Sequence, residues 1–350
     1  MKSQVSVQTG CRVHLGLIPA GDDRFCGMGM MVNQPGFQIQ LAGSPELRIE
    51  SEDFADRIRS AVEIWRNNFG PTDQELPSSL DCLPVALKVT GEVRPHCGLG
   101  SGTQLDLALA QGLTRFFDCE NPASKPNDFQ LAKAFGRGAR SRVGSLGFST
   151  GGLVVDVGQD VGEPANEADT VFQRPVPEGW RVLLVVPKDS AGPSSQLEVS
   201  LFKELTKRPA AGVERARELA RDVIIPALQN SDFQTFEQAV FEYGVLAGKA
   251  FEPLQGGIYN GESVADVVKF LRNHSAIGVG QSSWGPCVFC WTEDDGSAQT
   301  LYRVTREHFG SQVDIFVGQP LNCGAQILVD SEIKMDVSLS KEERRCQNSV

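Results

Sequence analysis

The sequence predicts an α+β fold in two layers, divided into two lobes. Strand-like and helix-like segments mix along its 350 residues without the regular β-α-β alternation of a doubly wound parallel sheet. The length corresponds to about two domains of roughly 100–200 residues. An acidic, proline-rich stretch at residues 160–179 is typical of an exposed connection. We therefore expect one lobe over residues 1–175, a second over residues 176–335, and a polar, disordered tail over residues 336–350.

Strands separated by glycine-rich turns fill most of the predicted first lobe. Alternating or β-branched residues predict strands at residues 11–17, 37–42 and 85–90. A run of glycines then leads into an amphipathic helix that carries Leu105 and Phe116 on one stripe. A second helix is expected near residues 128–137. After it, a long glycine- and serine-rich loop is expected to enter an apolar strand.

The predicted second lobe combines strands with several helices. Helices are expected at residues 198–206, 211–229, 232–249 and 263–273. Strands are expected at residues 180–187, on both sides of a turn at 282–286, and near 314–318 and 325–330. Pro226 should end or kink the second helix, because proline lacks the N–H that a helix interior needs. Ser231 or Asp232 is expected to cap the third helix, and Ser263 with Asp266 forms a near capping box in the fourth.

The charge balance argues against a nucleic-acid-binding protein. Lys and Arg number 33 and Asp and Glu number 44, which gives a formal net charge of −11, whereas nucleic-acid binders usually carry a basic face. Net charge does not exclude an anionic small-molecule ligand, because it does not report the charge of one pocket. No window approaches ~18 consecutive apolar residues and the N-terminus lacks the apolar core of a secretory signal, so no membrane partner is expected.

The cysteines indicate a cytoplasmic protein. There are nine, an odd number at irregular spacing, which is typical of reduced thiols rather than a disulfide framework. The close pair is Cys287 and Cys290, in a run that predicts a strand. Side chains three residues apart on a strand point to opposite faces, so we expect two buried structural cysteines and no zinc half-site.

A glycine-rich loop before the first helix has the features of a phosphate cradle. Its residues are Gly98, Leu99, Gly100, Ser101, Gly102, Thr103 and Gln104. Glycines let backbone N–H groups approach an anion, and a helix N-terminus favours negative charge. The alternative is a glycine-rich turn with a Ser or Thr cap. The loop lacks the Gly-Lys-Ser/Thr of a Walker motif and the spacing of the dinucleotide fingerprint.

Three other segments carry candidate site residues. Arg137, Arg140 and Arg142 fall within six residues, beside Ser141, and suit bidentate phosphate binding, although a solvated basic turn is the alternative. His14 lies on a predicted strand behind Arg12, where a structural histidine is the alternative to a catalytic one. A glycine-rich turn between strands carries three further candidate residues, Gln281, Ser282 and Trp284. This turn could equally be a plain hairpin.

Together these segments resemble the GHMP superfamily, named for galactose, homoserine, mevalonate and phosphomevalonate kinases. Residues 95–103 are similar to its second motif, P-x-x-x-G-L-G-S-S, and residues 278–286 to its third. Within the superfamily, the order of Arg12-x-His14-Leu-Gly, the glycine loop, Gly136-Arg-Gly-x-Arg140-Ser and Gln281-Ser-Ser-Trp284 resembles the β-ribofuranosylaminobenzene 5′-phosphate synthases. The resemblance covers roughly residues 10–330. It implies the two-lobed GHMP-kinase-like α+β fold.

The resemblance also implies a reaction. That family condenses phosphoribosyl pyrophosphate with 4-aminobenzoate or 4-hydroxybenzoate, releases carbon dioxide and pyrophosphate, and forms a C–C glycoside on the way to tetrahydromethanopterin. Mg²⁺ is the expected companion of the pyrophosphate, no organic cofactor is expected, and homodimers are common. The resemblance implies catalytic roles for His14, Arg24, Arg140 and Glu198. It implies a metal-binding role for Asp156, and phosphate or substrate binding by Arg12, Arg137, Ser141, the glycine loop and residues 281, 282 and 284.

Two departures from the superfamily keep two alternatives in view. GHMP kinases place a catalytic Asp in a glycine-rich segment. The corresponding residues of this sequence, 141–147, include no carboxylate, and Glu198 lacks the glycine that precedes this glutamate in the family. The first alternative is an ATP-dependent small-molecule kinase, which predicts ATP consumption and a carboxylate base in the pocket. The second is a non-catalytic metabolite-binding protein of the same fold, which predicts ligand binding without turnover.

Overall fold

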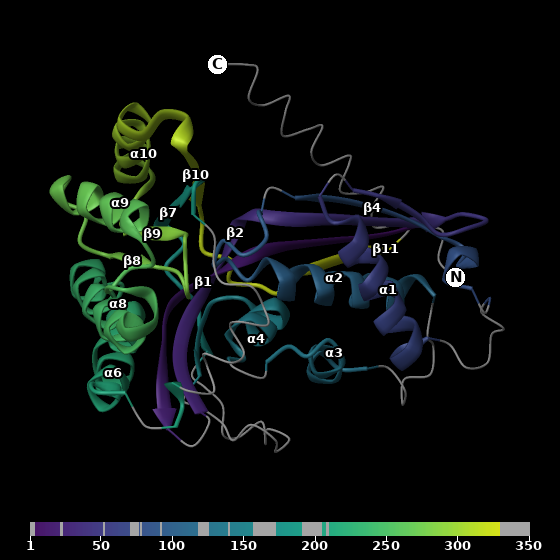
Figure 1. Ribbon diagram of the computed structural model, residues 1–350, viewed down its shortest axis with the longest axis horizontal. Coiled ribbons are helices and arrows are strands. Elements are labelled where there is room, and N and C mark those ends of the chain that lie inside the picture. The colour runs from purple at the N-terminus through teal and green to yellow at the C-terminus, as the bar shows by residue number, and fades with distance from the viewer. Residues whose placement is uncertain are drawn as a thin grey trace.

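The computed structural model describes residues 4–21, 24–51, 53–70, 77, 79–91, 93–117, 126–138, 141–156, 173–190, 205–207 and 210–329, and of Arg24 the backbone alone. The predicted tail at residues 336–350 lies outside this part of the chain. Two sheets with helices against them form an α+β architecture, as predicted (Figure 1).

The first sheet is built on a long antiparallel hairpin. Its path is β11-β1-β2-β4-β3, with β5 paired to β2 and β6 paired to β5, and only β3 runs parallel to its neighbour. The strands are β1 (Gln4–Gly21), β2 (Arg24–Gly43), β3 (Arg48–Glu50), β4 (Val85–Gly91), β5 (Leu153–Asp156), β6 (Gln173–Arg174) and β11 (Gln326–Val329). The β1–β2 register shifts at three points, one of them between His14 and Gly16. A strand irregularity therefore lies at the predicted site.

The helices of the first half cover one face of this sheet (Figure 1). They are α1 (Ala55–Phe69), α2 (Ser101–Phe116), α3 (Asp128–Ala134) and α4 (Val143–Thr150). Helix α2 packs on β1 and β2, and α1 packs on α2. Leu105, Leu109, Leu113 and Phe116 are all buried, which confirms the stripe predicted from the sequence.

The second sheet has the order β10-β7-β9-β8 and is antiparallel throughout. Its strands are β7 (Arg181–Pro187), β8 (Val279–Gln281), β9 (Val288–Thr292) and β10 (Val313–Gly318). The helices of this half are α6 (Val213–Glu218), α7 (Ile225–Gln229), α8 (Phe233–Gln255), α9 (Glu262–Asn273) and α10 (Asp295–Phe309). Helix α8 contacts both β1 and β8, so it joins the two sheets. The predicted division at residues 175 and 176 stays a prediction; β11, far beyond it, pairs with β1 of the first sheet.

Several local predictions are corrected by the structure. The loop expected after α3 contains helix α4, and two helices without a counterpart among the predictions, α1 and α10, are present. Pro226 does not end its helix: the π-helical segment η3 (Leu219–Ile224) connects α6 to α7, and Pro226 lies in the first turn of α7. The alternative, that Pro226 kinks the helix, stays a prediction. Helix α9 has Gly261 at its N-cap with no side-chain cap, and the Ser263 hydroxyl donates to Asp189 instead.

Other local predictions are confirmed. Asp232 caps α8 by accepting a hydrogen bond from the Thr235 N–H at 3.0 Å. Cys287 and Cys290 are both buried, and they belong to two different hydrophobic clusters, as expected for opposite faces. Among the described residues, no helix combines the length and the apolar character that crossing a bilayer requires.

Candidate active site

A cavity of about 270 Å³ lies where the start of α2, strand β1 and two loops meet. It brings together nine of the residues singled out in the sequence: Arg12, His14, Gly98, Gly100, Ser101, Gly102, Thr103, Arg137 and Ser141. Leu17, Arg57, Pro95, His96 and Ser283 also face it, with Gly136 and Gly138. The glycine loop and the arginine segment, 33 or more positions apart in the sequence, thus line one space. We call this space the arginine cavity.

The glycine loop turns directly into helix α2 at the wall of this cavity. Gly100 is the N-cap in a left-handed conformation, φ 68°, and no side chain caps the helix. The N–H groups of Ser101 and Gly102 begin the helix, where no preceding turn supplies acceptors. Backbone donors and the positive end of the helix dipole therefore face a cavity that also contains arginine side chains.

The glycine loop is fixed by β1 and by the turn before β9. The Arg12 N–H donates to the Leu99 carbonyl at 3.0 Å, and the Arg12 Nη2 donates to the Gly98 carbonyl at 3.3 Å. The Ser282 hydroxyl donates to the same Gly98 carbonyl at 2.8 Å and accepts from the His14 N–H at 2.9 Å. Gly98 has φ 88°, and a Cβ there would lie 2.4 Å from the Ser282 carbonyl oxygen. The close packing of these two loops requires glycine at this position.

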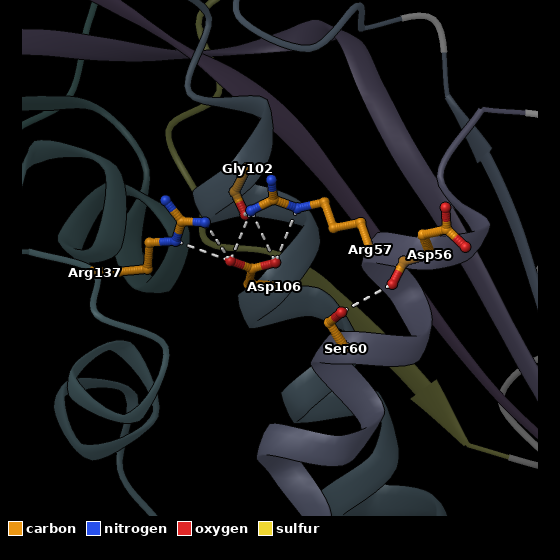
Figure 2. Close-up of polar contacts among 6 residues, drawn as sticks. All are labelled: Asp56, Arg57, Ser60, Gly102, Asp106 and Arg137. Carbon is orange, nitrogen blue, oxygen red and sulfur yellow. Dashed lines mark hydrogen bonds and ion pairs between the residues drawn. The ribbon is translucent and has the colours of Figure 1, made fainter. Parts of the chain in front are cut away.

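Two arginines meet over one carboxylate at the start of α2 (Figure 2). Arg57 of α1 donates from Nε and Nη2 to Asp106 at 2.9–3.2 Å. Arg137, from the segment after α3, donates from Nε and Nη2 to Asp106 Oδ2 at 2.8 and 2.6 Å. The Asp106 side chain is 6% exposed, and those of Arg57 and Arg137 are 36% and 31% exposed. The carboxylate is buried while both guanidinium groups reach the cavity.

His14 lies buried beneath the cavity. Its Nε2 is 3.3 Å from the Ser141 hydroxyl, and its Nδ1 makes no hydrogen bond of normal geometry among the described residues, with the Gly16 carbonyl nearby. Burial, and then the nearby Arg12 cation, lower the pKa of His14 well below its usual value of 6.5. His14 is therefore a neutral imidazole at pH 7.

The depressed pKa of His14 predicts a pH dependence of stability. Below pH 6.5 the unfolded state binds a proton at this histidine that the folded state does not, so the free energy of unfolding falls as the pH falls. One such proton contributes at most about 1.4 kcal/mol per pH unit. We expect the difference in unfolding free energy between wild type and H14Q to shrink between about pH 6.5 and pH 5, in urea titrations. Parallel curves for the two proteins would contradict it.

Comparisons with known proteins agree with this geometry. A family model described as "GHMP kinases C terminal" matches residues 224–311. The homoserine kinase structure from Cytophaga hutchinsonii superposes with a TM-score of 0.60 at 16% identity, covering 94% of this chain and 98% of that one. The chain has the GHMP-kinase fold. The two-lobed GHMP-like α+β class predicted from the sequence is therefore confirmed.

Within the GHMP fold, the sequence is similar to one group of synthases. It is 26% identical over 316 residues to "Beta-ribofuranosylphenol 5'-phosphate synthase" of Methanothermobacter thermautotrophicus, which covers 84% of this chain and 90% of that protein. It is 29% identical over 339 residues to the protein of the same name from Archaeoglobus fulgidus, which covers 92% of this chain and 99% of that one. The resemblance predicted from the sequence is confirmed.

Some predicted site residues do not face the arginine cavity. Gln104 is buried, accepts from the Thr9 hydroxyl at 2.8 Å and donates to the Gly144 carbonyl at 2.9 Å. Trp284 packs edge-on against Phe251, and Gln281 accepts from the Asn260 N–H. Their contacts, like those of buried Leu99 and Ser282, hold the loops of the GHMP fold together. Their predicted contact with substrate stays a prediction, as do the roles of Arg140 and Glu198, which lie outside the described residues, and of Arg24, whose side chain is not described.

No carboxylate among the described residues lines the arginine cavity. The segment in which GHMP kinases carry their catalytic Asp enters α4 here, with Ser141 at the cavity and Val143 buried. Asp106 contacts two arginines that line the cavity, and both ion pairs already occupy its carboxylate. The part of the chain that the structure describes therefore supplies no evident base for a kinase at this site.

Asp156, the predicted metal ligand, lies in a second, smaller cavity of about 150 Å³ with Cys26, Gly27 and Tyr243. Its Oδ2 accepts from the Arg142 N–H at 2.7 Å, and its Oδ1 is 3.3 Å from Arg142 Nη2. No three metal-ligating side chains gather anywhere in the described ranges. Mg²⁺ usually binds one or two carboxylates together with substrate phosphates. The described residues thus do not fit a protein-held Mg²⁺ at either cavity.

The sequence reasoning missed Arg57, which lines the arginine cavity, and Asp106, which holds Arg57 and Arg137 in place from behind the lining. Arg57 lies in a helix that was not predicted, and Asp106 is the single acidic residue inside the predicted amphipathic helix. Buried charge on a helix is unusual unless it is paired. The sequence offered one signal of this buried ion pair: a carboxylate one turn into the predicted amphipathic helix, in a chain with arginines that could pair with it.

Proposed function

We propose that this protein is a β-ribofuranosyl-benzene-type 5′-phosphate synthase, which joins phosphoribosyl pyrophosphate to a para-substituted benzoate and releases carbon dioxide and pyrophosphate. The observation that carries the proposal is the arginine cavity: three arginines, two histidines and an open helix N-terminus line it, with no described carboxylate. Such a lining suits a ligand with several phosphate oxygens. The names of the relatives favour a phenol product, hence 4-hydroxybenzoate over 4-aminobenzoate as acceptor.

The pyrophosphate of the donor is assigned to residues 98–103. The bond from C1 of the ribose to the pyrophosphate oxygen breaks, and its electron pair leaves with pyrophosphate. Negative charge then develops beside the N–H groups of Ser101 and Gly102 and beside Arg12, which are already in place. Preorganised donors of this kind stabilise the transition state more than the bound substrate.

The benzoate supplies the new carbon–carbon bond. The ring carbon that bears the carboxylate donates an electron pair to C1, helped by the para hydroxyl or amino group. The bond to the carboxylate then breaks, carbon dioxide leaves, and its electron pair restores the aromatic ring. The electrons balance within the two substrates. Mg²⁺ is proposed to enter as a complex with the donor, since the described residues provide no carboxylate for it, and no step here depends on it.

The buried environment of His14 favours a role for its neutral imidazole in this scheme. A neutral imidazole hydrogen-bonded to Ser141 keeps the floor of the cavity uncharged and fixes the serine hydroxyl. An imidazolium would be buried and held beside Arg12, and burial first and that cation second lower the pKa of His14. We propose that the neutral form is the active one.

The proposal is tested with purified protein, phosphoribosyl pyrophosphate, MgCl₂ and each benzoate. We expect pyrophosphate release that depends on the benzoate, and no ATP consumption when ATP replaces the donor. ATP-dependent phosphorylation of a small molecule would favour the kinase instead. Donor binding in calorimetry without turnover with either benzoate would favour the non-catalytic alternative.

A further inference from the structure

One arginine would balance the charge of the Asp106 carboxylate, but two arginines, Arg57 and Arg137, contact it. Arg57 and Arg137 come from different elements, and both direct the Nε–Nη2 side of the guanidinium toward the Asp106 carboxylate (Figure 2). Arg57 Nη2 also lies 3.3 Å from the Gly102 carbonyl oxygen. Within the described residues, the Nη1 of neither arginine has a hydrogen bond. Both groups are thus oriented by the protein and keep donors for a ligand.

We propose that Arg57 and Arg137 form a two-arginine clamp that binds the 5′-phosphate of the sugar donor, with Asp106 as the positioning residue. That the ligand is a sugar phosphate rests on the proposed function; that it is a phosphate monoester rests on the cavity. The clamp is adjacent to the glycine loop, because Arg57 Nη2 donates to the carbonyl of Gly102 in that loop. A ligand with a phosphate at each end can therefore occupy the loop and the clamp together.

The lining of the cavity favours a phosphate over the carboxylate of the benzoate. Of the residues that the structure describes, only Leu17 and Pro95 contribute apolar side chains to it, so an aromatic ring would find little apolar surface there. A phosphate monoester carries about −1.5 to −2 charges near pH 7, against −1 for a benzoate. Arg57 and Arg137 together with Asp106 leave one net positive charge at the clamp. This charge attracts the more negative phosphate more strongly than the benzoate carboxylate.

Gly102 provides the independent structural observation. A Cβ at this position would lie 2.7 Å from Arg57 Nη2 and 3.3 Å from Arg137 Nη2. The second residue of a helix has no need of glycine, and alanine there would favour the helix. Glycine at residue 102 instead leaves the space that both guanidinium groups occupy. The superfamily motif has serine at this place, so the clamp and the glycine occur together in this chain.

The same position gives a test that separates binding from folding. In G102A the backbone N–H stays and the helix gains propensity, so the melting temperature should not fall, but the two guanidinium groups must move. We expect the affinity for ribose 5-phosphate, measured by calorimetry, to fall at least about tenfold in G102A and in R57Q, the size of a lost charge-assisted contact. The matched controls are G296A and R59Q. Gly296 is the second residue of α10, and Arg59 is an exposed arginine of α1 that pairs with Asp81. Both should bind as wild type does.

Kinetics distinguish the clamp from a structural role. In R57Q and D106N we expect the KM for phosphoribosyl pyrophosphate to rise about tenfold or more, with kcat within about twofold, because the clamp holds a part of the donor away from the reacting carbon. Unchanged affinity in R57Q and G102A, or no binding of ribose 5-phosphate by the wild type at 10 mM, would overturn the clamp. If the wild type binds ribose 5-phosphate, the variants lose it and no synthase turnover is found, the clamp stands and the proposed function fails.

Discussion

Replacing Gly98 by alanine is expected to lower the free energy of unfolding by about 3 kcal/mol or more and to remove activity. A Cβ at this position would lie 2.4 Å from the Ser282 carbonyl oxygen and 3.1 Å from the Gly285 carbonyl oxygen, so the backbone of one loop must move. The φ of 88° adds strain of its own. Because the Gly98 carbonyl accepts hydrogen bonds from Arg12 and Ser282, this movement would displace the phosphate loop. Urea titrations and the pyrophosphate assay give the two measurements.

A matched variant separates strain from collision. Gly256 also has a positive φ, 75°, but a Cβ there would meet nothing within 4 Å. G256A should therefore lose only the strain contribution, about 1–2 kcal/mol, and keep full activity. Equal losses in G98A and G256A would show that the contact between the two loops has no special weight.

Replacing Asp156 by alanine is expected to lower the free energy of unfolding by about 3–5 kcal/mol, the usual cost of removing one partner from a buried ion pair. The side chains of Arg142 and Asp156 are 9% and 4% exposed, so the guanidinium group would remain buried without its carboxylate. The loss is predicted to be the same with and without Mg²⁺, because the carboxylate is assigned to Arg142. Removing Arg142 as well should recover part of the loss, since the two substitutions share one interaction.

A metal-binding role for Asp156 makes a different prediction. Mg²⁺ would then stabilise the wild type and not D156A, by the usual linkage between binding and folding. A loss below about 1 kcal/mol in D156A, or a loss that appears only when Mg²⁺ is present, would contradict the structural assignment.

The elements that were predicted correctly are those whose apolar residues follow a clear pattern along the sequence. Strands β7 and β9 are apolar except for Arg181 and Thr292 at their ends, and α2 carries a regular stripe, so burial follows the pattern directly. Helix α4 reads Val-Gly-Ser-Leu-Gly-Phe-Ser-Thr, a composition of low helix propensity, and forms because Phe148 is buried and Gly147 lies against Met31. Helix α1 was readable: Ile58, Ala61, Val62 and Trp65 follow helical spacing and are buried.

The site was predictable as a set of segments and not as a set of contacts. The glycine loop and His14 have local patterns that carry chemistry. The partners that orient the charged groups lie far away in sequence: Ser141 lies 127 residues from His14, and Asp106 lies 49 residues from Arg57. No local pattern specifies such pairs, because the fold alone brings them together. For the same reason the net charge of −11 gave no sign of a cavity lined by arginines.

The stoichiometry of the products tests the central claim most directly. The protein is incubated with phosphoribosyl pyrophosphate and 4-hydroxybenzoate labelled with ¹³C at the carboxyl carbon, and released carbon dioxide, pyrophosphate and the coupled product are quantified. The proposed reaction predicts one carbon dioxide for each pyrophosphate, and an unlabelled product with a bond from ribose C1 to a ring carbon. Pyrophosphate release without carbon dioxide, or a product that keeps the labelled carboxylate, would contradict it.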